Sequence, residues 1–458
     1  MAFDLHIKNI GKLTDAKLRI GRFTVLAGPN NTGKSFVSKI LYSLFNAMNA
    51  NHAEAALHTI TGHIRWERDR LRSALSEKAS MDSLYADLEN TIHKMEALAA
   101  EQSFDDPAEI DRFLAKVSNM AKKFPELFRE IRSSAAKQQP RPAGSLLKDF
   151  ENTLDRLQEV FGDMTAEKFM RSGIDLMIKE NLIQNFQVAQ STQLRGTEEG
   201  ESKFSIPDTV EFKFGGSDRT FAIQHFDFQK LKQYSKVIYL ESPIHWKLKN
   251  ALEYLHLSDR HQHTRRDRLL GVPGYFYDLA SELRSEYTED MDFPGLAEKL
   301  TSKNVLGGKL VISPDTGEIW FREKDRSSPL VLTATGVVNL GILALLIERK
   351  ILKKDSFIFF DEPEAHLHTE WQVVMAEVLF ELAKGGAHVV IATHSDEILK
   401  WLEVHIKHHP DDVGLVALNK FPPDTVTYGE ESFEDKMAEI KQALTKPFAD
   451  LYMKGLGG

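Results

Sequence analysis

Gly28-Pro29-Asn30-Asn31-Thr32-Gly33-Lys34-Ser35 fits the phosphate-binding pattern G-x-x-x-x-G-K-[S/T] at every position. The apolar run 23–27 before it predicts a buried strand, and residues 36–45 after it carry apolar side chains at helical spacing. A strand, a glycine-rich loop and a helix form the setting in which backbone N–H groups and a helix N-terminus face a phosphate. The stretch therefore predicts an α/β fold with a nucleotide site.

Each part of this loop has an expected role in holding ATP. The backbone from Gly28 to Phe36 would surround the phosphates. Lys34 would reach the β- and γ-phosphates, and the Ser35 hydroxyl would ligate Mg²⁺. A glycine turn that matched the pattern by chance would not be expected to have both flanks.

A second expected part of the site lies far along the chain. The run 357–360 is continuously apolar and ends in Asp361-Glu362-Pro363. Such a run is typical of a parallel strand buried on both faces, and open α/β sheets bind ligands at the carboxyl ends of their strands. Asp361 would hold Mg²⁺, directly or through water, and Glu362 would polarise the attacking water as general base.

A third apolar run, 389–393, predicts another buried strand that ends at His394-Ser395. A neutral His394 at the same sheet edge would hydrogen-bond the γ-phosphate or the water. An acidic pair after a strand is common by chance, but the three features in this order predict one ATP site.

These segments resemble the ABC-type ATPases of the SMC, RecF and OLD group. Residues 3–13 look like the strand that opens those heads, D-E-P-E-A-H-L-H at 361–368 looks like their D-E-P-E-x-H-L-H segment, and 392–395 is similar to their T-H-S switch. The likeness covers roughly residues 1–50 and 330–400. Within the group, the chain looks most like the ATPase subunits of bacterial anti-phage systems such as PARIS and Septu.

The resemblance implies a signature motif that binds the nucleotide held by a second protomer. Its candidate is the segment 333–339, where Thr335 and Gly336 precede an apolar helix, although Ala334 stands at the usual serine position. The alternative is an ordinary helix cap. The resemblance also implies a sensor glutamine; Gln187 is chosen, with Gln184 and Gln190 equally available.

Composition sets the outer bounds. The chain has 458 residues, of which 42% are hydrophobic and 27% charged, which favours a soluble globular protein of more than one core. Cysteine is absent, which excludes disulfides, thiolate catalysis and cysteine-based zinc sites. With no long apolar run and no leader, we expect a cytoplasmic protein without membrane contact. A net charge of −9 does not steer the whole molecule toward nucleic acid.

The expected domain organisation has four parts: residues 1–50 form the start of the ATPase head, 51–165 a helical (short coiled-coil) insertion, 166–330 a mixed α/β part, and 331–458 the end of the head. Apolar stripes in the insertion, at 84–98, 110–124 and 146–161, predict two or three antiparallel helices. They would form either a subdomain packed on the head or a short arm that binds a partner.

Two further segments bear on partners. Residues 260–268 are the most basic window, which predicts weak nucleic-acid or acidic-partner contact, unless it is a solvated loop. After His394, a strand-like run at 413–418 and a helix at 433–451 are expected, with no Asp-x-Asp metal cluster. OLD proteins continue into a nuclease domain, so we expect this chain not to be a nuclease.

The sequence thus predicts an ABC-type head whose homodimer, or higher homo-oligomer, buries ATP between the phosphate loop of one protomer and the signature of another. One hypothesis is a sensor ATPase of an anti-phage system that controls a separate effector, expected to be a nuclease. The other is a RecF- or SMC-like repair or maintenance ATPase that binds DNA directly. A transporter ATPase fits poorly, because the signature differs and the gap between Ser35 and Asp361 is too long.

Overall fold

The computed structural model describes residues 2–74, 79–100, 107–136, 144–162, 164–197, 200–214, 221–227, 230, 236–241, 246, 272–283, 292–423 and 432–456. The chain divides into two compact units. The head unit lies within Met1–Asn49, Ile178–Ser258 and Arg268–Gly458, and the helical unit lies chiefly within Ala50–Met177. Among the described residues, no helix has the length and apolar character needed to cross a bilayer.

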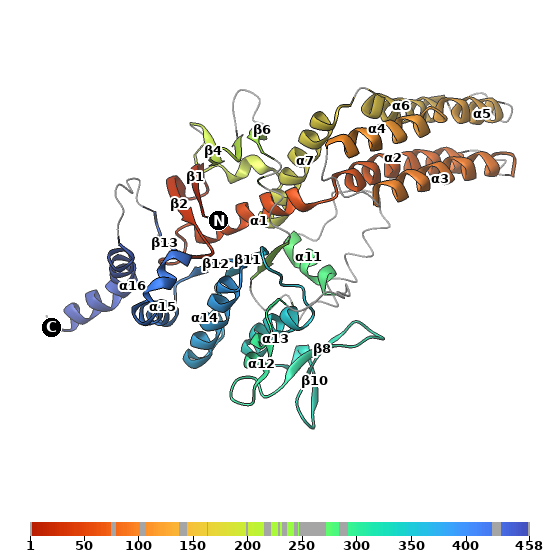
Figure 1. Cartoon of the computed structure of the whole chain (residues 1–458). Helices are drawn as coiled ribbons and strands as arrows, with labels where there is room; N and C mark the ends of the chain where they lie inside the picture. The colour runs from red at the N-terminus through yellow and green to blue at the C-terminus, as the bar shows by residue number, and fades with distance from the viewer. Residues whose placement is uncertain are drawn as a thin grey trace. The chain divides into compact units, whose positions relative to one another are not determined.

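A five-stranded parallel sheet is the centre of the head unit (Figure 1). Its middle strands are buried along their whole length, as the continuous apolar runs predicted. The expected α/β class with a parallel sheet is therefore confirmed. In spatial order the strands are β13 (Val416–Lys420), β3 (Phe23–Ala27), β12 (His388–Thr393), β11 (Phe357–Asp361) and β7 (Val237–Leu240).

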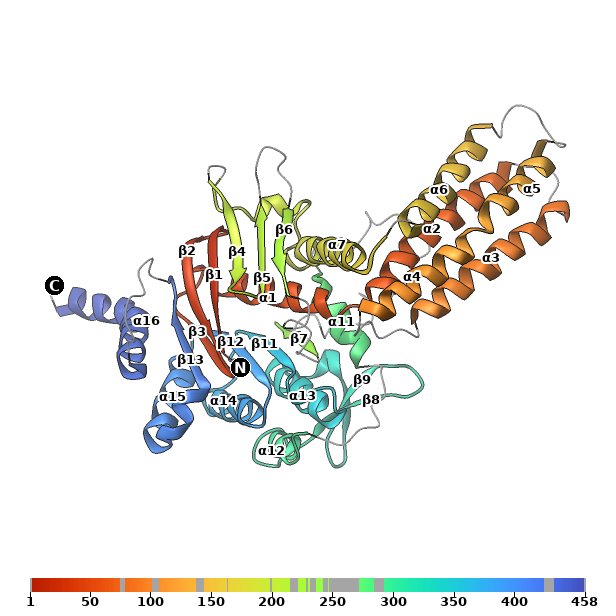
Figure 2. The ribbon, with the colours of Figure 1, turned by 45° about the horizontal axis from the view of Figure 1, so that its top comes forward.

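A second, antiparallel sheet covers helix α1 (Lys34–Asn49) on the side away from the parallel sheet (Figure 2). The ring of Phe45 in α1 lies 4.7 Å from the ring of Phe357 and 6.3 Å from that of Phe3, so the helix packs between the two sheets. The antiparallel strands, in spatial order, are β2 (Leu13–Ile20), β1 (Phe3–Ile10), β4 (Ser202–Ile206), β5 (Val210–Phe214) and β6 (Phe221–Phe226).

The remaining elements of the head unit are helices and one small sheet. The ring of Phe380 packs on Phe23 at 5.2 Å, so its helix lies against the parallel sheet. The helices are α11 (Gly274–Glu282), α12 (Leu296–Thr301), α13 (Thr335–Glu348), α14 (Thr369–Lys384), α15 (Asp396–His408) and α16 (Phe433–Leu456); the three-stranded sheet has the order β10 (Ser327–Pro329), β9 (Ile319–Arg322), β8 (Lys309–Ile312).

The last strand differs from its predicted position. The sequence predicted a strand at 413–418, but the chain forms the 3₁₀ helix η3 (Pro410–Leu415) first, and β13 begins at Val416. Pro410 presets the first turn of η3, and the Asp412 carboxylate accepts from Lys384 at 3.1 Å and lies 2.9 Å from the His405 ring nitrogen. These contacts stabilise the 3₁₀ turn, so the strand begins only at Val416.

The helical unit has more helices than the two or three predicted. It contains α2 (His52–Ala74), α3 (Ala79–Ala100), α4 (Pro107–Ala121), α5 (Phe124–Ala136), α6 (Gly144–Gly162) and the start of α7 (Ala166–Phe186). The stripe 110–124 predicts one helix, but α4 ends at Ala121 and α5 begins at Phe124, because Pro125 has no N–H to donate to the carbonyl of Ala121 and is tolerated only in the first turn of a helix. Across α2 and α3, Arg65 donates to Glu96 at 2.7 Å.

A buried histidine in β12 is expected to make the head sensitive to acid. The His388 side chain is 2% exposed and stacks on Phe357 with 5.2 Å between ring centroids. Burial, assisted by the charge of Arg22, lowers the pKa of His388 to about 4. Because the unfolded chain binds the proton more readily, the contribution of the neutral ring is complete above about pH 6.5 and is lost as the pH falls toward 4.

We therefore expect His388→Asn to become less destabilising, relative to wild type, as the pH falls. The difference in unfolding free energy should shrink by about 2 kcal/mol between pH 7.5 and pH 4.5, as measured by urea unfolding. His408→Asn, which changes an exposed histidine of α15, is the control and should show no such trend. A difference for His388→Asn that stays constant with pH would contradict the assignment.

Candidate functional site

The phosphate loop joins the end of β3 to the start of α1, as predicted. A Cβ atom on Gly28 would lie 2.1 Å from the carbonyl oxygen of Phe421, so only glycine fits at this close approach. Gly33 has φ +103°, and its carbonyl accepts from the N–H groups of Phe36 and Val37 to begin the helix. Glycine is thus required at position 28 by the close approach of Phe421 and at position 33 by the positive φ angle.

The Lys34 side chain folds back over its own loop. Its Nζ donates to the carbonyl oxygens of Gly28 at 2.7 Å and Pro29 at 2.8 Å. Burial lowers the pKa of Lys34, whereas the carboxylates of Glu362 and Asp361 act in the opposite direction. The ammonium group therefore lies inside the loop, where a phosphate could replace the two carbonyls as its partner.

The Ser35 hydroxyl and the Asp361 carboxylate meet, although more than 300 residues separate them. Ser35 Oγ donates to Asp361 Oδ1 at 3.0 Å, and the Tyr239 hydroxyl donates to Oδ2 at 3.1 Å. Burial raises the pKa of Asp361 to about 6, and the charge of Glu241 adds to this effect. The Ser35 hydroxyl and the buried Asp361 carboxylate are hard oxygen donors that fit a bound Mg²⁺, which commonly takes one or two protein ligands and substrate phosphates.

Glu241 is a member of the site that the sequence analysis missed. Strand β7 pairs with β11 so that Leu240 lies opposite Phe360, which places Glu241 beside Asp361 at the same sheet edge. The Lys39 ammonium group of α1 lies 3.1 Å from Glu241 Oε1, and the Tyr275 hydroxyl donates to Oε2. The signal was present, because Glu241 follows an apolar run just as Asp361 does.

Glu362 and His394 face each other at the ends of β11 and β12. His394 Nδ1 lies 3.6 Å from Glu362 Oε1, and both side chains are nearly half exposed. Glu362 has φ +53°, in the left-handed region, which turns its side chain out of the line of the strand. The arrangement leaves both groups open to a water or a phosphate.

A second acid, Glu364, fixes the His394 segment and was also missed. Its Oε1 accepts from the Thr393 hydroxyl at 2.7 Å and from the His394 backbone N–H at 3.0 Å. The side chain is only 6% exposed. Glu364 thus positions His394 without facing solvent itself.

Thr335 and Gly336 form the first turn of α13, but in this chain they are tied to another loop. A Cβ atom on Gly336 would lie 2.6 Å from the His366 carbonyl oxygen. The Asn339 side chain donates to the carbonyls of Pro363 at 3.0 Å and Ala365 at 3.3 Å. The signature helix is therefore joined to the loop that follows Glu362.

Gln187 lies just after the end of α7, and its neighbour Phe186 contacts Phe36, which directly follows the phosphate loop. The ring of Phe186 packs on Phe36 with 4.9 Å between centroids. The Gln187 amide donates to the carbonyl of Val272 at 2.9 Å and to that of Gln184. Its role as sensor stays a prediction.

The chain thus brings together the phosphate loop, Asp361, Glu362 and His394, whereas Gly336 and Asn339 of α13 contact the 362–368 loop. The basic window 260–268 lies outside the described residues. Within the described ranges, no group of three or more His, Cys, Asp or Glu side chains is arranged to hold a metal ion. A Mg²⁺ site of Ser35, Asp361 and phosphate oxygens is of a different type.

Comparison with known proteins gives one family. The family described as "AAA ATPase domain" matches residues 57–399, which is most of the chain. No curated protein matches this chain.

Similar solved structures include an SmcHead bound to the C-winged helix domain of ScpA (11% identity, 87% of this chain, 91% of that chain, TM-score 0.37). The SMC head domain from Thermotoga maritima gives 12% identity over 87% of this chain and 91% of that chain, with TM-score 0.33. An Smc head domain with a coiled coil and joint derived from Pyrococcus yayanosii gives 12% identity over 97% of this chain and 100% of that chain, with TM-score 0.33.

Proposed function

Because the chain belongs to the AAA ATPase domain family, we propose that it is an ABC-type, ATP-driven switch that controls a separate effector protein in anti-phage defence. The observation that supports this most is the meeting of Ser35 with Asp361 beneath the phosphate loop. Binding of ATP would close two heads on each other, and hydrolysis would let them open.

The chain's own residues supply each chemical requirement. Lys34 would leave the carbonyls of Gly28 and Pro29 and donate to the β- and γ-phosphates. Ser35 and Asp361 would hold the Mg²⁺ that offsets negative charge on the phosphate oxygens. Glu362 would accept the proton of the attacking water, and His394 would orient the water or the γ-phosphate.

An exposed apolar pair supports a second protomer at the signature. Leu332 is 79% exposed and Val331 62%, just before Thr335. Adjacent large apolar side chains in open solvent are typical of an interaction surface. The N-terminus of α13 has free N–H groups that favour an anion, and the γ-phosphate of another protomer's ATP would supply it.

The dimer has a direct test in the Glu362→Gln background, where ATP should remain unhydrolysed. In Mg-ATP this protein is expected to elute as a dimer by light scattering, and without ATP as a monomer. Adding Leu332→Asp should keep it monomeric with ATP binding unchanged, because an aspartate there would be desolvated in the interface. Val404→Asp changes a single exposed apolar residue on α15 (53% exposed) and should leave the dimer intact. Equal dimerisation of the two variants would rule out the surface at Leu332.

The defence role rests on the resemblance to anti-phage ATPases and is tested in cells. The gene, with its neighbouring reading frames, should lower phage plating efficiency, and Glu362→Gln should alter that protection. A strain that loses resistance to DNA damage instead, with no change in phage plating, would favour the repair or maintenance alternative. Tight duplex binding by the purified protein at physiological salt would favour it as well.

A further inference from the structure

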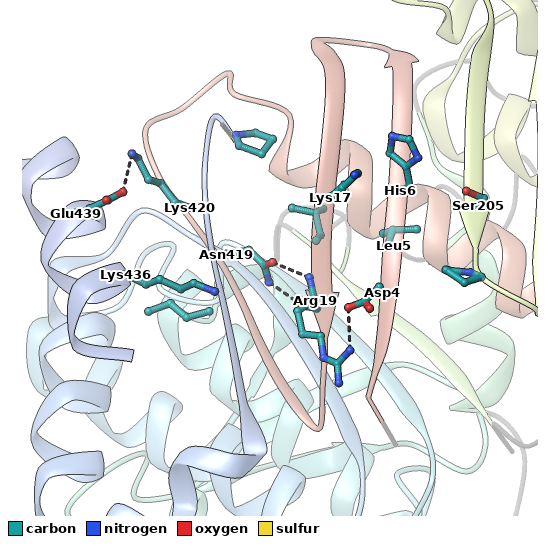
Figure 3. A pocket seen from close by; sticks show the side chains of 14 residues that line it. Asp4, Leu5, His6, Lys17, Arg19, Ser205, Asn419, Lys420, Lys436 and Glu439 are labelled. Carbon is teal, nitrogen blue, oxygen red and sulfur yellow. Dashed lines mark hydrogen bonds and ion pairs between the residues drawn. The ribbon is translucent and has the colours of Figure 1, made fainter. Parts of the chain in front are cut away.

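A cavity of about 460 Å³ lies in the head unit, away from the residues of the ATP site (Figure 3). It is bounded by β1, β2 and β4 of the antiparallel sheet, by the end of β13, and by the first turns of α16. Lys420 of β13 is in register with Ala27 of β3, so the cavity adjoins the strand that carries the phosphate loop. None of the loop's own residues lines it.

The charges of this cavity are not balanced. Arg19 pairs with Asp4 at 2.8 Å, and Lys420 pairs with Glu439 at 2.9 Å. Among the ion pairs of the described residues, neither Lys17 nor Lys436 has an acidic partner. Two lysines from different elements therefore line one cavity without an acidic partner among the described ion pairs.

The two lysines come from different walls of the cavity, one from β2 and one from α16, so the excess positive charge is concentrated at this cavity. Lys17 projects from the outward side of β2, opposite His6 of β1, and Lys436 lies in the first turns of α16. Figure 3 shows Lys436 extended toward Asn419, whose amide is held by the backbone of Arg19 on both sides. Asn419 is thereby held rigidly in the lining.

The rest of the lining suits the organic part of a ligand. Pro207 and Pro423 contribute apolar surface, Leu5, Leu18 and Leu418 lie almost wholly buried behind the lining, and Ser205 contributes a hydroxyl. A volume of this size is within the usual range for small-molecule sites. A nucleic-acid strand, by contrast, would need a row of cations along an open groove to neutralise successive phosphates.

We propose that this cavity binds a small organic phosphate, with Lys17 and Lys436 pairing with the phosphate oxygens. The site is distinct from the phosphate loop and does not depend on the function proposed above. A dianionic phosphate would balance the two uncompensated lysines, and the apolar surface would receive the organic group.

The test uses the full-length chain with Lys34→Ala, so that the phosphate loop contributes little to anion binding. AMP and pyrophosphate serve as probes in isothermal titration at millimolar concentration. Saturable binding is expected, and it should weaken at least tenfold when Lys17→Gln and Lys436→Gln are added together. The control pair Lys8→Gln and Lys12→Gln changes exposed lysines outside the cavity and should weaken binding less than twofold.

Three outcomes would overturn the proposal. Absence of saturable binding by both probes would mean that the cavity is not a phosphate site. Equal losses in the two lysine pairs would mean that the anions bind through general surface charge. Binding of a single-stranded oligonucleotide, lost with Lys17→Gln and Lys436→Gln while AMP and pyrophosphate do not bind, would assign the surface to nucleic acid instead.

Discussion

Glu362→Gln protein is expected to bind Mg-ATP as tightly as wild type and to hydrolyse it at least about 100-fold more slowly. The glutamine keeps the size of the side chain and leaves Lys34, Ser35 and Asp361 untouched, so the phosphate contacts remain. It cannot take a proton from water; His394 loses the carboxylate of Glu362 at 3.6 Å from Nδ1 and keeps that of the buried Glu364 at 3.4 Å. Equilibrium binding of a fluorescent ATP analogue and steady-state phosphate release separate the two effects.

Two further variants separate the loss of the base from the loss of ATP binding and from the removal of a surface glutamate. Lys34→Ala should weaken ATP binding as well as turnover, because it removes the charge inside the phosphate loop. Glu370→Gln changes an exposed glutamate in the first turn of α14 and should hydrolyse at close to the wild-type rate. A Glu362→Gln protein with wild-type turnover would show that another group is the base.

The strands around the ATP site could be predicted because their signals are local. Apart from Thr24 and Thr393, the runs 23–27, 357–360 and 389–393 are apolar, as burial on both faces of a parallel sheet favours. Once the strands are parallel neighbours, their carboxyl ends must share one edge. That is why Ser35 and Asp361 could be assigned to one site before their contact was known.

Glu241 and Glu364 escaped prediction because their roles depend on pairing and burial. Glu241 acquires its position only when β7 takes its register beside β11, and strand register cannot be deduced from β7 alone. Glu364 belongs to the D-E-P-E-A-H-L-H segment, but its role comes from its burial and from the hydrogen bond that it accepts from Thr393. For the helix break near Pro125, by contrast, the sequence did contain a signal, because proline interrupts helices. The continuous apolar stripe 110–124 nevertheless favoured a single helix.

The tie between the signature helix and the Glu362 loop changes how the shared site must be tested. A large side chain at Gly336 would displace the His366 carbonyl of its own protomer, so a loss of activity would not distinguish a shared site from a damaged loop. Thr335 is a better position, since it is only half buried in the first turn of α13. A glutamate is favourable at a helix N-terminus, so Thr335→Glu should fold while repelling a γ-phosphate.

Thr335→Glu and Lys34→Ala proteins are each expected to be nearly inactive alone and to regain about half of wild-type ATPase activity as a purified mixed dimer. In that dimer, one composite site combines both defects. The other combines the intact phosphate loop of the Thr335→Glu protomer with the intact signature of the Lys34→Ala protomer. Two affinity tags allow isolation of the mixed dimer, and phosphate release measures its activity.

The pairing of Lys34→Ala with Glu362→Gln is the matched control for this rescue. Both changes lie on the same side of the composite site, so neither site of that mixed dimer has an intact loop and base together, and activity should stay lost. If the Thr335→Glu mixture regained nothing although mixed dimers formed, Thr335 and Gly336 would serve only to cap α13. Rescue in both mixtures would mean that Lys34 and Glu362 of one active site come from different protomers, which would contradict the proposed division of the site. Rescue in the first mixture alone requires that the phosphate loop and the signature of one active site come from different protomers.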